Sequence, residues 1–164
     1  MEAAEIHERI KALVGAGLLE SVLDAKDPFV RLAPDVMVEL CRFLRDEAEL
    51  RFDVLSNLSG VDYRADGQIE VVYHLYSYPH RHKVVLKVRT PRDEAVLPSV
   101  ESIWKAANWH EREVYDLLGV TFTGHPDLRR LLMPEDWVGH PLRKDFVEPD
   151  EYHGISTRRE SLLR

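Results

Sequence analysis

Hydrophobic residues in the first part of the chain recur with two periods, which predict helices and strands in turn. Apolar positions between residues 6 and 14 have helical spacing, and the glycines that follow end this run. Two short strand-like segments come next, at 18–23 and 29–32. A second apolar stripe with helical spacing predicts a helix over residues 35–49, and Pro34 is well placed at its first position.

The middle of the chain has the alternating pattern of strands. Segments 52–58, 69–78 and 83–89 are rich in apolar, β-branched and aromatic residues, and turn residues separate them. A helix is expected at about residues 99–107. Because several strands follow one another directly, the order of elements favours an α+β fold with a mostly antiparallel sheet packed with helices.

A short helix with clear end signals follows these strands. Asn108 and Glu111 have the spacing of a capping box, and Gly119 is the residue type that ends helices. Arg112 and Asp116 lie four residues apart, so they are expected to pair along the helix surface.

Beyond residue 119 the pattern changes. Residues 120–164 contain four of the nine prolines of the chain, and no helical or strand period continues through them. A long irregular segment is functional or disordered, yet the large apolar residues here are poor choices for a solvated tail. The sequence therefore predicts an α+β domain at 1–119, followed by an extended irregular C-terminal arm at 120–164 that binds partner subunits.

Charge and hydropathy limit the classes of partner. The net charge is -7, from 29 acidic residues against 22 Lys and Arg, which disfavours nucleic acid as the partner. No apolar run is long enough to cross a bilayer, and the N-terminus resembles neither a signal nor a transit peptide. We therefore expect a cytosolic bacterial protein that reaches a membrane only through other proteins.

The single cysteine and two of the tryptophans are candidates for the core. Cys41 lies on the apolar stripe of the 35–49 helix, where a buried thiol is the expected role. One cysteine cannot supply the thiolates of an iron–sulfur cluster. Trp104 and Trp109 flank a helix junction and are also expected in the core.

A long motif spans the short helix and the start of the arm. Glu-Arg-Glu is followed by an acid three residues later, two aliphatic residues, a histidine, and then a basic residue with further aliphatics. This pattern resembles the signature of the C-subunit family of respiratory complex I, the NADH–quinone oxidoreductase, and the resemblance covers about residues 28–147. The motif residues are Glu111, Arg112, Glu113, Asp116, His125 and Arg129.

The resemblance implies a role in an enzyme complex without active-site residues in this chain. Members of the C-subunit family carry no cofactor and no metal, whereas flavin and iron–sulfur clusters belong to other subunits. They pack against the D subunit, which helps form the quinone site, and they have the B and I subunits as neighbours. The assembled enzyme moves electrons from NADH to quinone and translocates protons at the bacterial inner membrane, with this chain on the cytoplasmic face. An equivalent subunit of a membrane-bound hydrogenase or related complex is the alternative.

The arm carries the predicted partner interface. Acidic neighbours largely cancel the charge of its cations, which favours pairing with a protein over binding of a phosphate. Trp137 has no evident core in its own segment and is therefore predicted as an anchor of the interface. The predicted interface residues are Arg129, Arg130, Met133, Trp137, Pro141, Arg143, Lys144 and Phe146.

A stand-alone metal hydrolase is the alternative from another class. It would use His110 and His125 with the carboxylates of the motif, Glu111, Glu113 and Asp116. Helical geometry places Glu111 well around the helix from Glu113, and His110 lacks the spacing of a zinc-binding helix. Structural ion pairing is therefore the expected role of these carboxylates.

Overall fold

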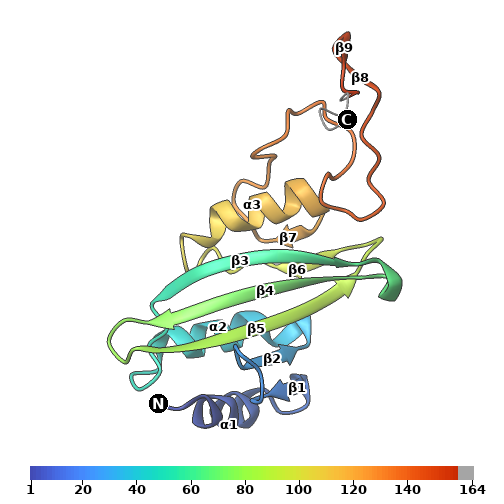
Figure 1. Ribbon diagram of the computed structural model, residues 1–164. Helices are drawn as coiled ribbons and strands as arrows, with labels where there is room; N and C mark the ends of the chain where they lie inside the picture. Colours follow the sequence, from blue (N-terminus) through green and yellow to red (C-terminus); the bar gives the residue numbers. More distant parts are fainter. Residues whose placement is uncertain (159–164) are drawn as a thin grey trace.

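The computed structural model describes residues 1–158 and is built on one five-stranded sheet (Figure 1). The strand order is β1-β2-β5-β4-β3. All neighbouring strands are antiparallel except β2 and β5, which run parallel. The α+β fold with a mostly antiparallel sheet is thus confirmed. The strands are β1 Leu18–Val22, β2 Phe29–Leu32, β3 Val54–Tyr63, β4 Gln68–Ser77 and β5 His82–Pro91.

Helices pack against one face of this sheet, where the core forms. Alternate residues of β4, among them Tyr73 and Leu75, are almost fully buried on that face. Helix α2 adds Cys41, which is fully buried as expected, so that burial raises the pKa of its thiol. The helices are α1 Ala3–Val14, α2 Met37–Asp46 and α3 Ala107–Leu118, and short 3-10 turns occur at Gly15–Gly17, Pro34–Val36 and Arg64–Asp66.

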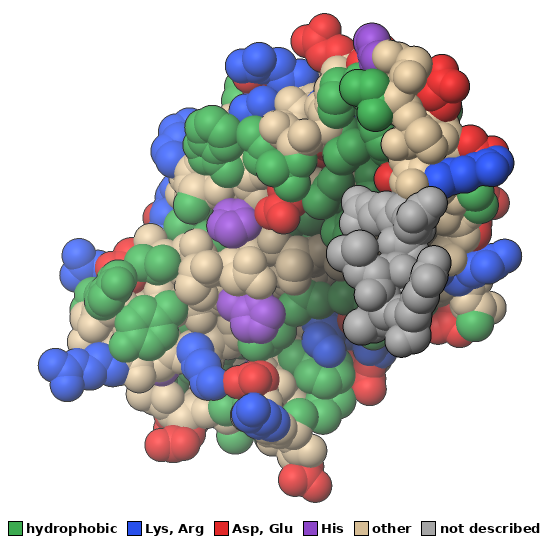
Figure 2. Space-filling model, turned by 45° about the horizontal axis from the view of Figure 1, so that its top comes forward, with side chains coloured by type: hydrophobic (Ala, Val, Ile, Leu, Met, Phe, Trp, Pro, Cys, Tyr) green, Lys and Arg blue, Asp and Glu red, His purple; other side chains and the backbone are tan. Residues whose placement is uncertain are grey.

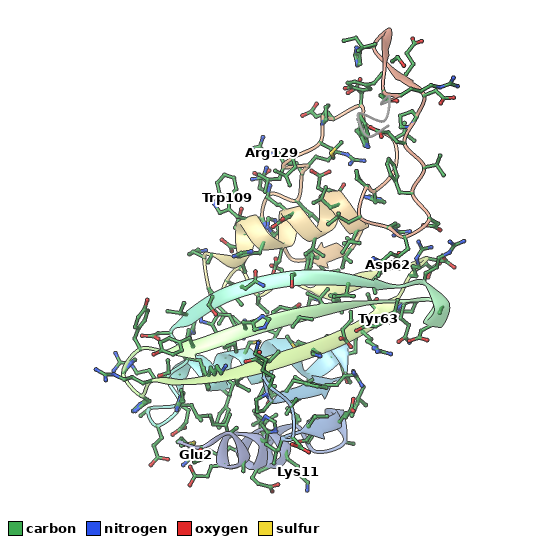
Figure 3. All side chains as sticks on the ribbon, viewed as in Figure 1. Glu2, Lys11, Asp62, Tyr63, Trp109 and Arg129 are labelled. Atoms are coloured by element: carbon green, nitrogen blue, oxygen red, sulfur yellow. The ribbon has the colours of Figure 1, made fainter. Side chains whose placement is uncertain are left out.

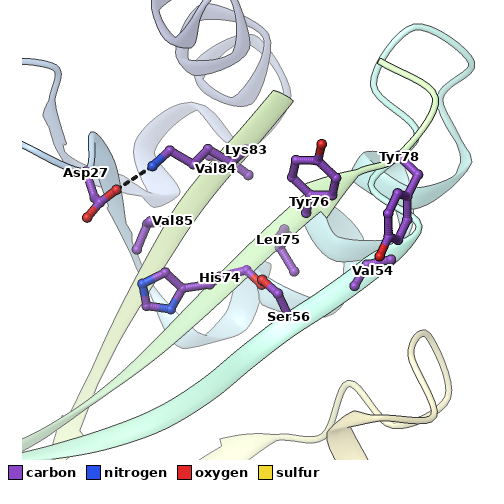
Figure 4. Close-up of a pocket in the computed structure, with 10 residues that line it drawn as sticks. All are labelled: Asp27, Val54, Ser56, His74, Leu75, Tyr76, Tyr78, Lys83, Val84 and Val85. Carbon is purple, nitrogen blue, oxygen red and sulfur yellow. Dashed lines mark hydrogen bonds and ion pairs between the residues drawn. The ribbon is translucent and has the colours of Figure 1, made fainter. Parts of the chain in front are cut away.

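The opposite face of the sheet is only partly covered. His74 and Tyr76 of β4 are half-buried there, and a pocket of about 250 Å³ opens beside them (Figure 4). An ion pair between Lys83 and Asp27, 2.5 Å apart, lies at the rim of this pocket. An antiparallel sheet commonly has one face buried against the core and the other exposed to solvent.

Two expectations for the segment before α3 are wrong. Residues 99–107 do not form a helix, because β6, Val96–Pro98, is followed by turns until α3 begins at Ala107. The capping box of Asn108 and Glu111 is also absent, since the N-cap of α3 is Ala106, two residues earlier, and the side chain of Glu111 is buried. The ending at Gly119 is confirmed, because this residue has a φ of +76°, which glycine adopts without strain.

The two tryptophans near α3 differ in burial. Trp104 lies in the core as expected, and its indole N–H donates to the carbonyl oxygen of Phe52 at 2.9 Å. Trp109 was expected there too but is 61% exposed. It lies on the outer side of α3, where the guanidinium of Arg112 is 5.2 Å from its ring centre.

The core continues for a few residues past Gly119, and the irregular segment follows. Strand β7, Thr121–Thr123, pairs in parallel with β6, and Phe122 is buried. The rest of the described arm has no regular element until a two-stranded hairpin of β8, Glu151–Tyr152, and β9, Ile155–Ser156. No helix among residues 1–158 is long and apolar enough to span a bilayer.

Candidate functional site: the fastening of the C-terminal arm

Asp116 of α3 is the centre of the contacts that hold the arm to the domain. Its carboxylate is fully buried and accepts the backbone N–H groups of Leu131, Leu132 and Met133 at 3.0, 2.7 and 2.9 Å. Arg130 adds a charged partner, with its Nη1 2.8 Å from Oδ1 of Asp116. Burial on its own raises the pKa of Asp116, but the three N–H groups and Arg130 together hold it below the usual range.

Arg112 also binds the arm, so the expected surface pair with Asp116 is wrong. The guanidinium of Arg112 donates to the carbonyl oxygens of Arg129 and Arg130, at 3.1 and 3.2 Å. The spacing of four residues would allow a pair along the helix, but Asp116 is occupied by Arg130 and by backbone N–H groups of the arm, and Arg112 binds the two carbonyl groups instead.

The arm satisfies the exposed carbonyl groups at the end of α3. The ring nitrogen Nδ1 of His140 donates to the carbonyl of Asp116 at 2.9 Å, and the N–H of Leu142 donates to that of Leu117 at 3.0 Å. Arg143 donates from Nε to the carbonyl of Leu118 at 2.7 Å. The last carbonyls of a helix lack partners within it and favour a cation, so the arm caps this helix.

A second buried carboxylate, Asp62 at the end of β3, fastens the arm farther along (Figure 3). Its two oxygens accept hydrogen bonds from Nε and Nη2 of Arg92 at 2.8 and 3.2 Å. One of these oxygens also accepts the backbone N–H of Lys144 at 2.8 Å. The bonds to Arg92 lower the pKa of Asp62. Arg92 also pairs with Asp145 of the arm. The contact from Asp62 to Lys144 joins residues 82 positions apart, so no local spacing in the sequence indicated Asp62 or Arg92.

Glu111 has a different role from the ion pairing predicted for it. Its buried carboxylate accepts the hydroxyl of Ser99 at 2.6 Å and the N–H of Val100 at 2.7 Å, which fixes the turn after β6. His125 is the nearest basic group, 4.0 Å away and buried as well. Burial raises the pKa of Glu111 to about 7.

The carboxylates of the motif do not converge as a metal site would require. Glu111 and Asp116 are both buried, and each accepts hydrogen bonds from a different segment of the chain. Glu113, by contrast, is exposed on the flank of α3. No group of three potential ligands is close enough to hold a metal ion anywhere in residues 1–158. A coordinating centre needs at least three such side chains around one point.

The predicted interface residues divide between internal and outward roles. Arg130 and Arg143 have guanidinium groups bound within the chain, whereas the side chains of Arg129 and Lys144 are exposed. Trp137 and Phe146 are half-buried against each other, with ring centres 6.4 Å apart. Met133 and Pro141 are also half-buried.

Large apolar side chains of the arm nevertheless remain in solvent. On the face shown in Figure 2, patches of hydrophobic side chains are open to solvent, with charged side chains around them. Leu132 is 60% exposed and Val147 is 83% exposed, although both follow segments that are firmly attached. The exposed set in the arm comprises Leu132, Val138, Leu142, Val147 and Ile155.

The class of protein defined here is a small α+β domain that holds an extended arm by two buried carboxylates, one on its last helix and one on the edge strand β3. The family described as "Respiratory-chain NADH dehydrogenase, 30 Kd subunit" matches residues 30–152, and the chain belongs to this family. It is therefore a subunit of a respiratory enzyme complex, and the resemblance based on the motif is confirmed.

Individual bacterial relatives agree with this family. The chain is 47% identical over 146 residues to the C subunit of NADH-quinone oxidoreductase from Roseiflexus sp. (strain RS-1), covering 88% of this chain and 84% of the relative. The protein of the same description from Chlorobium phaeobacteroides is 48% identical over 128 residues, 77% of each chain.

Two solved structures share the fold. A chain of the membrane-bound sulfane sulfur reductase, an archaeal respiratory membrane complex, matches with a TM-score of 0.75 and 28% identity. That match covers 90% of this chain and 86% of the other. A trypsin-resistant fragment of Nqo5, residues 1–134, matches with a TM-score of 0.61 and 28% identity, covering 78% of this chain and the whole fragment.

Proposed function

We propose that this chain is a cofactor-free, non-catalytic subunit of the peripheral arm of a proton-translocating NADH–quinone oxidoreductase, where it supports the D subunit beside the quinone site. The observation that carries the proposal is the construction of the arm. Buried carboxylates fix its backbone to the domain, while apolar side chains such as Leu132 and Val147 point into solvent. Exposed apolar groups on a fixed scaffold are typical of a protein interface.

The absence of converging catalytic groups in the described residues supports a structural role. The two buried carboxylates of the motif bind backbone and hydroxyl groups that stabilise the fold, so neither is free to act on a substrate. In this proposal the electron carriers belong to other subunits. The chain reaches the cytoplasmic face of the bacterial inner membrane through the complex, with the B, D and I subunits as neighbours.

Trp137 is the proposed anchor of the interface with the D subunit. Its ring is only half-buried, packed 6.4 Å from the ring of Phe146 and 5.1 Å from that of Tyr152, so the rest of its aromatic surface is available to a partner protein. Trp137→Ala is expected to weaken binding of the D subunit by about 2 kcal/mol, roughly thirtyfold. Tyr78→Ala is the matched control, because Tyr78 is an exposed aromatic residue in the turn between β4 and β5.

The experiment is purification of the affinity-tagged chain from its native membranes, followed by cross-linking and titration of the purified D subunit. Cross-links from residues 129–146 to the D subunit are expected. A complex that retains the chain but gives no such cross-links, or equal affinities for both variants, would refute this assignment of the partner. Stoichiometric iron or flavin in the folded isolated chain would refute the cofactor-free role.

The similarity to the sulfane sulfur reductase complex favours one alternative, in which the same scaffold serves a hydrogenase-like or related respiratory complex. The two cases differ in their copurifying subunits. NADH-binding flavoprotein subunits support the main proposal, whereas a nickel-binding large subunit supports the alternative.

A further inference from the structure

We propose that the free edge of β3 and the groove beside α3 bind an extended segment of another protein of the complex, which adds to the sheet as a strand. The proposal rests on the proposed function, because the segment belongs to a neighbour in that complex. Its occupant is a strand with an apolar side chain for the groove and a Lys or Arg for Glu113.

The first observation is the position of β3 in the sheet. It is the last strand of the order β1-β2-β5-β4-β3 and is ten residues long, and it pairs only with β4 (Figure 1). Alternate residues of an edge strand direct their N–H and C=O groups away from the sheet. No other described backbone group bonds to these groups of β3. A strand that lacks a partner on one side is a ready site for another strand.

The second observation is a groove of about 140 Å³ between β3 and α3. Gly60 allows the helix to approach closely, because a Cβ atom there would lie 2.3 Å from Cδ1 of Leu118. Apolar side chains form the walls, and an apolar cavity of about 150 Å³ can hold a benzene-sized group. The walls are built from Leu58, Val114, Leu117, Leu118 and Leu142.

The third observation identifies the charge of the occupant. Glu113 also lines the groove, is exposed, and forms no ion pair with any residue in the described part of the chain. Asn57 and Ser59, which line the strand side, are uncharged. A cation on the incoming strand would therefore complement the groove, whereas a carboxylate would be repelled by Glu113.

The free edge of β3, the apolar wall of the groove and the carboxylate of Glu113 lie side by side, and each of them selects a different property of one ligand. The free edge selects an extended backbone, the groove selects an apolar side chain, and Glu113 selects a cation near it. A helix could use the groove but not the edge, because its own backbone groups are already paired.

Hydrogen exchange in the assembled complex tests the strand addition. Peptides covering 56–63 are compared between the isolated chain and the complex purified from native membranes. Exchange is expected to slow by at least about tenfold in the complex, while peptides of β5, which is paired on both sides, change little. A complex that contains the chain but leaves β3 exchanging as in the isolated chain overturns this proposal and leaves the proposed function intact.

Variants test the chemistry of the occupant. Glu113→Arg is expected to weaken retention of the chain in the complex by about tenfold, since it would meet a cation. Glu94→Arg is the control, because Glu94 is also exposed, has no ion pair among residues 1–158, and lies outside the groove. Leu142→Asp, a change at a 55% exposed position, should act like Glu113→Arg. Thermal melts of the isolated variants confirm that each one folds.

A photo-cross-linker at Asn57 identifies the segment itself. An extended segment with alternating apolar residues and a cation is expected, and exchanging that cation for Glu should restore binding of the Glu113→Arg chain. Cross-linking to a helix, or equal retention of Glu113→Arg and Glu94→Arg, overturns the proposed occupant.

Discussion

Replacing Asp116 by Asn should release the arm while leaving the domain folded. The two side chains have the same shape, but the amide can face its acceptor oxygen toward only one group of donors. Its NH2 group must then oppose either the N–H groups of residues 131–133 or the guanidinium of Arg130. The substitution therefore leaves buried donors without partners.

The expected cost follows from these four contacts. A hydrogen bond to a charged group contributes about 1.5–3 kcal/mol, and removing one partner of a buried ion pair costs about 3–5 kcal/mol. Because the amide keeps some of the bonds, we expect a loss of about 3 kcal/mol. That is more than about a hundredfold in the equilibrium between the attached and the released arm.

Hydrogen exchange of the isolated chain measures this equilibrium. Peptides covering 126–146 should exchange much faster in Asp116→Asn, while peptides of β4 and β5 stay protected. Asp127→Asn is the control, because Asp127 forms an exposed pair with Arg129 in the same segment. Equal exchange of the arm in the two variants would refute the role given to Asp116.

Acidification should have the same effect as this substitution, and the sign follows from the pKa. Interactions in the folded chain hold the pKa of Asp116 below its usual range, so its contribution to stability is complete above about pH 4. The contribution is lost as the pH falls through the lowered folded value. The arm should therefore remain attached across the neutral range and loosen only in acid.

Two further predictions concern the stability of the isolated chain. Glu111→Gln should flatten part of the pH dependence. The folded pKa of Glu111, about 7, exceeds the unfolded value of about 4.3, so the stability that this one carboxyl contributes is complete below about pH 4 and is lost as the pH rises to 7, by about 4 kcal/mol in all. Denaturant unfolding of the unsubstituted chain and of Glu111→Gln from pH 5 to 8 measures how the free energy of unfolding of each depends on pH. The prediction is contradicted if the two free energies change with pH in parallel. Gly119→Ala should loosen the arm by about 1 kcal/mol or more, because the φ of this residue is +76° and a Cβ atom would lie 2.5 Å from Nε2 of His140. Hydrogen exchange of residues 138–146 measures the loosening, and an unchanged rate would contradict the prediction.

Much of the domain could be predicted from the sequence because local pattern decides it. The strands β4 and β5 lie within two residues of their expected bounds, and Gly119 ends α3, since alternation and left-handed backbone are local properties. Trp109 shows the limit of such reasoning. Whether an aromatic residue at a helix start faces the core depends on how the helix is rotated, which its neighbours in sequence do not specify.

The fastening of the arm could be predicted only in part. The motif directed attention to Asp116 and Arg112, but the spacing suggested that they pair with each other. Their actual partners are largely backbone groups, which have no signature in the sequence. Asp62 illustrates the same limit, since its bond to the N–H of Lys144 depends on the complete fold. Glu111 breaks the rule that charged residues avoid the core, and only its contacts with the turn after β6 explain its burial.

The hydrogen bonds between Asp116 and the arm affect how this surface can change in evolution. Three of its contacts are made to backbone N–H groups, which every residue except proline possesses. The identity of the side chains at positions 131–133 is therefore independent of the attachment itself. A lineage can replace Leu132 by a polar, aromatic or charged residue to follow a change in its partner, while the arm keeps the same path over the domain. Because Asp116 binds backbone groups, the path of the arm can stay the same in evolution while the side chains that determine the partner change.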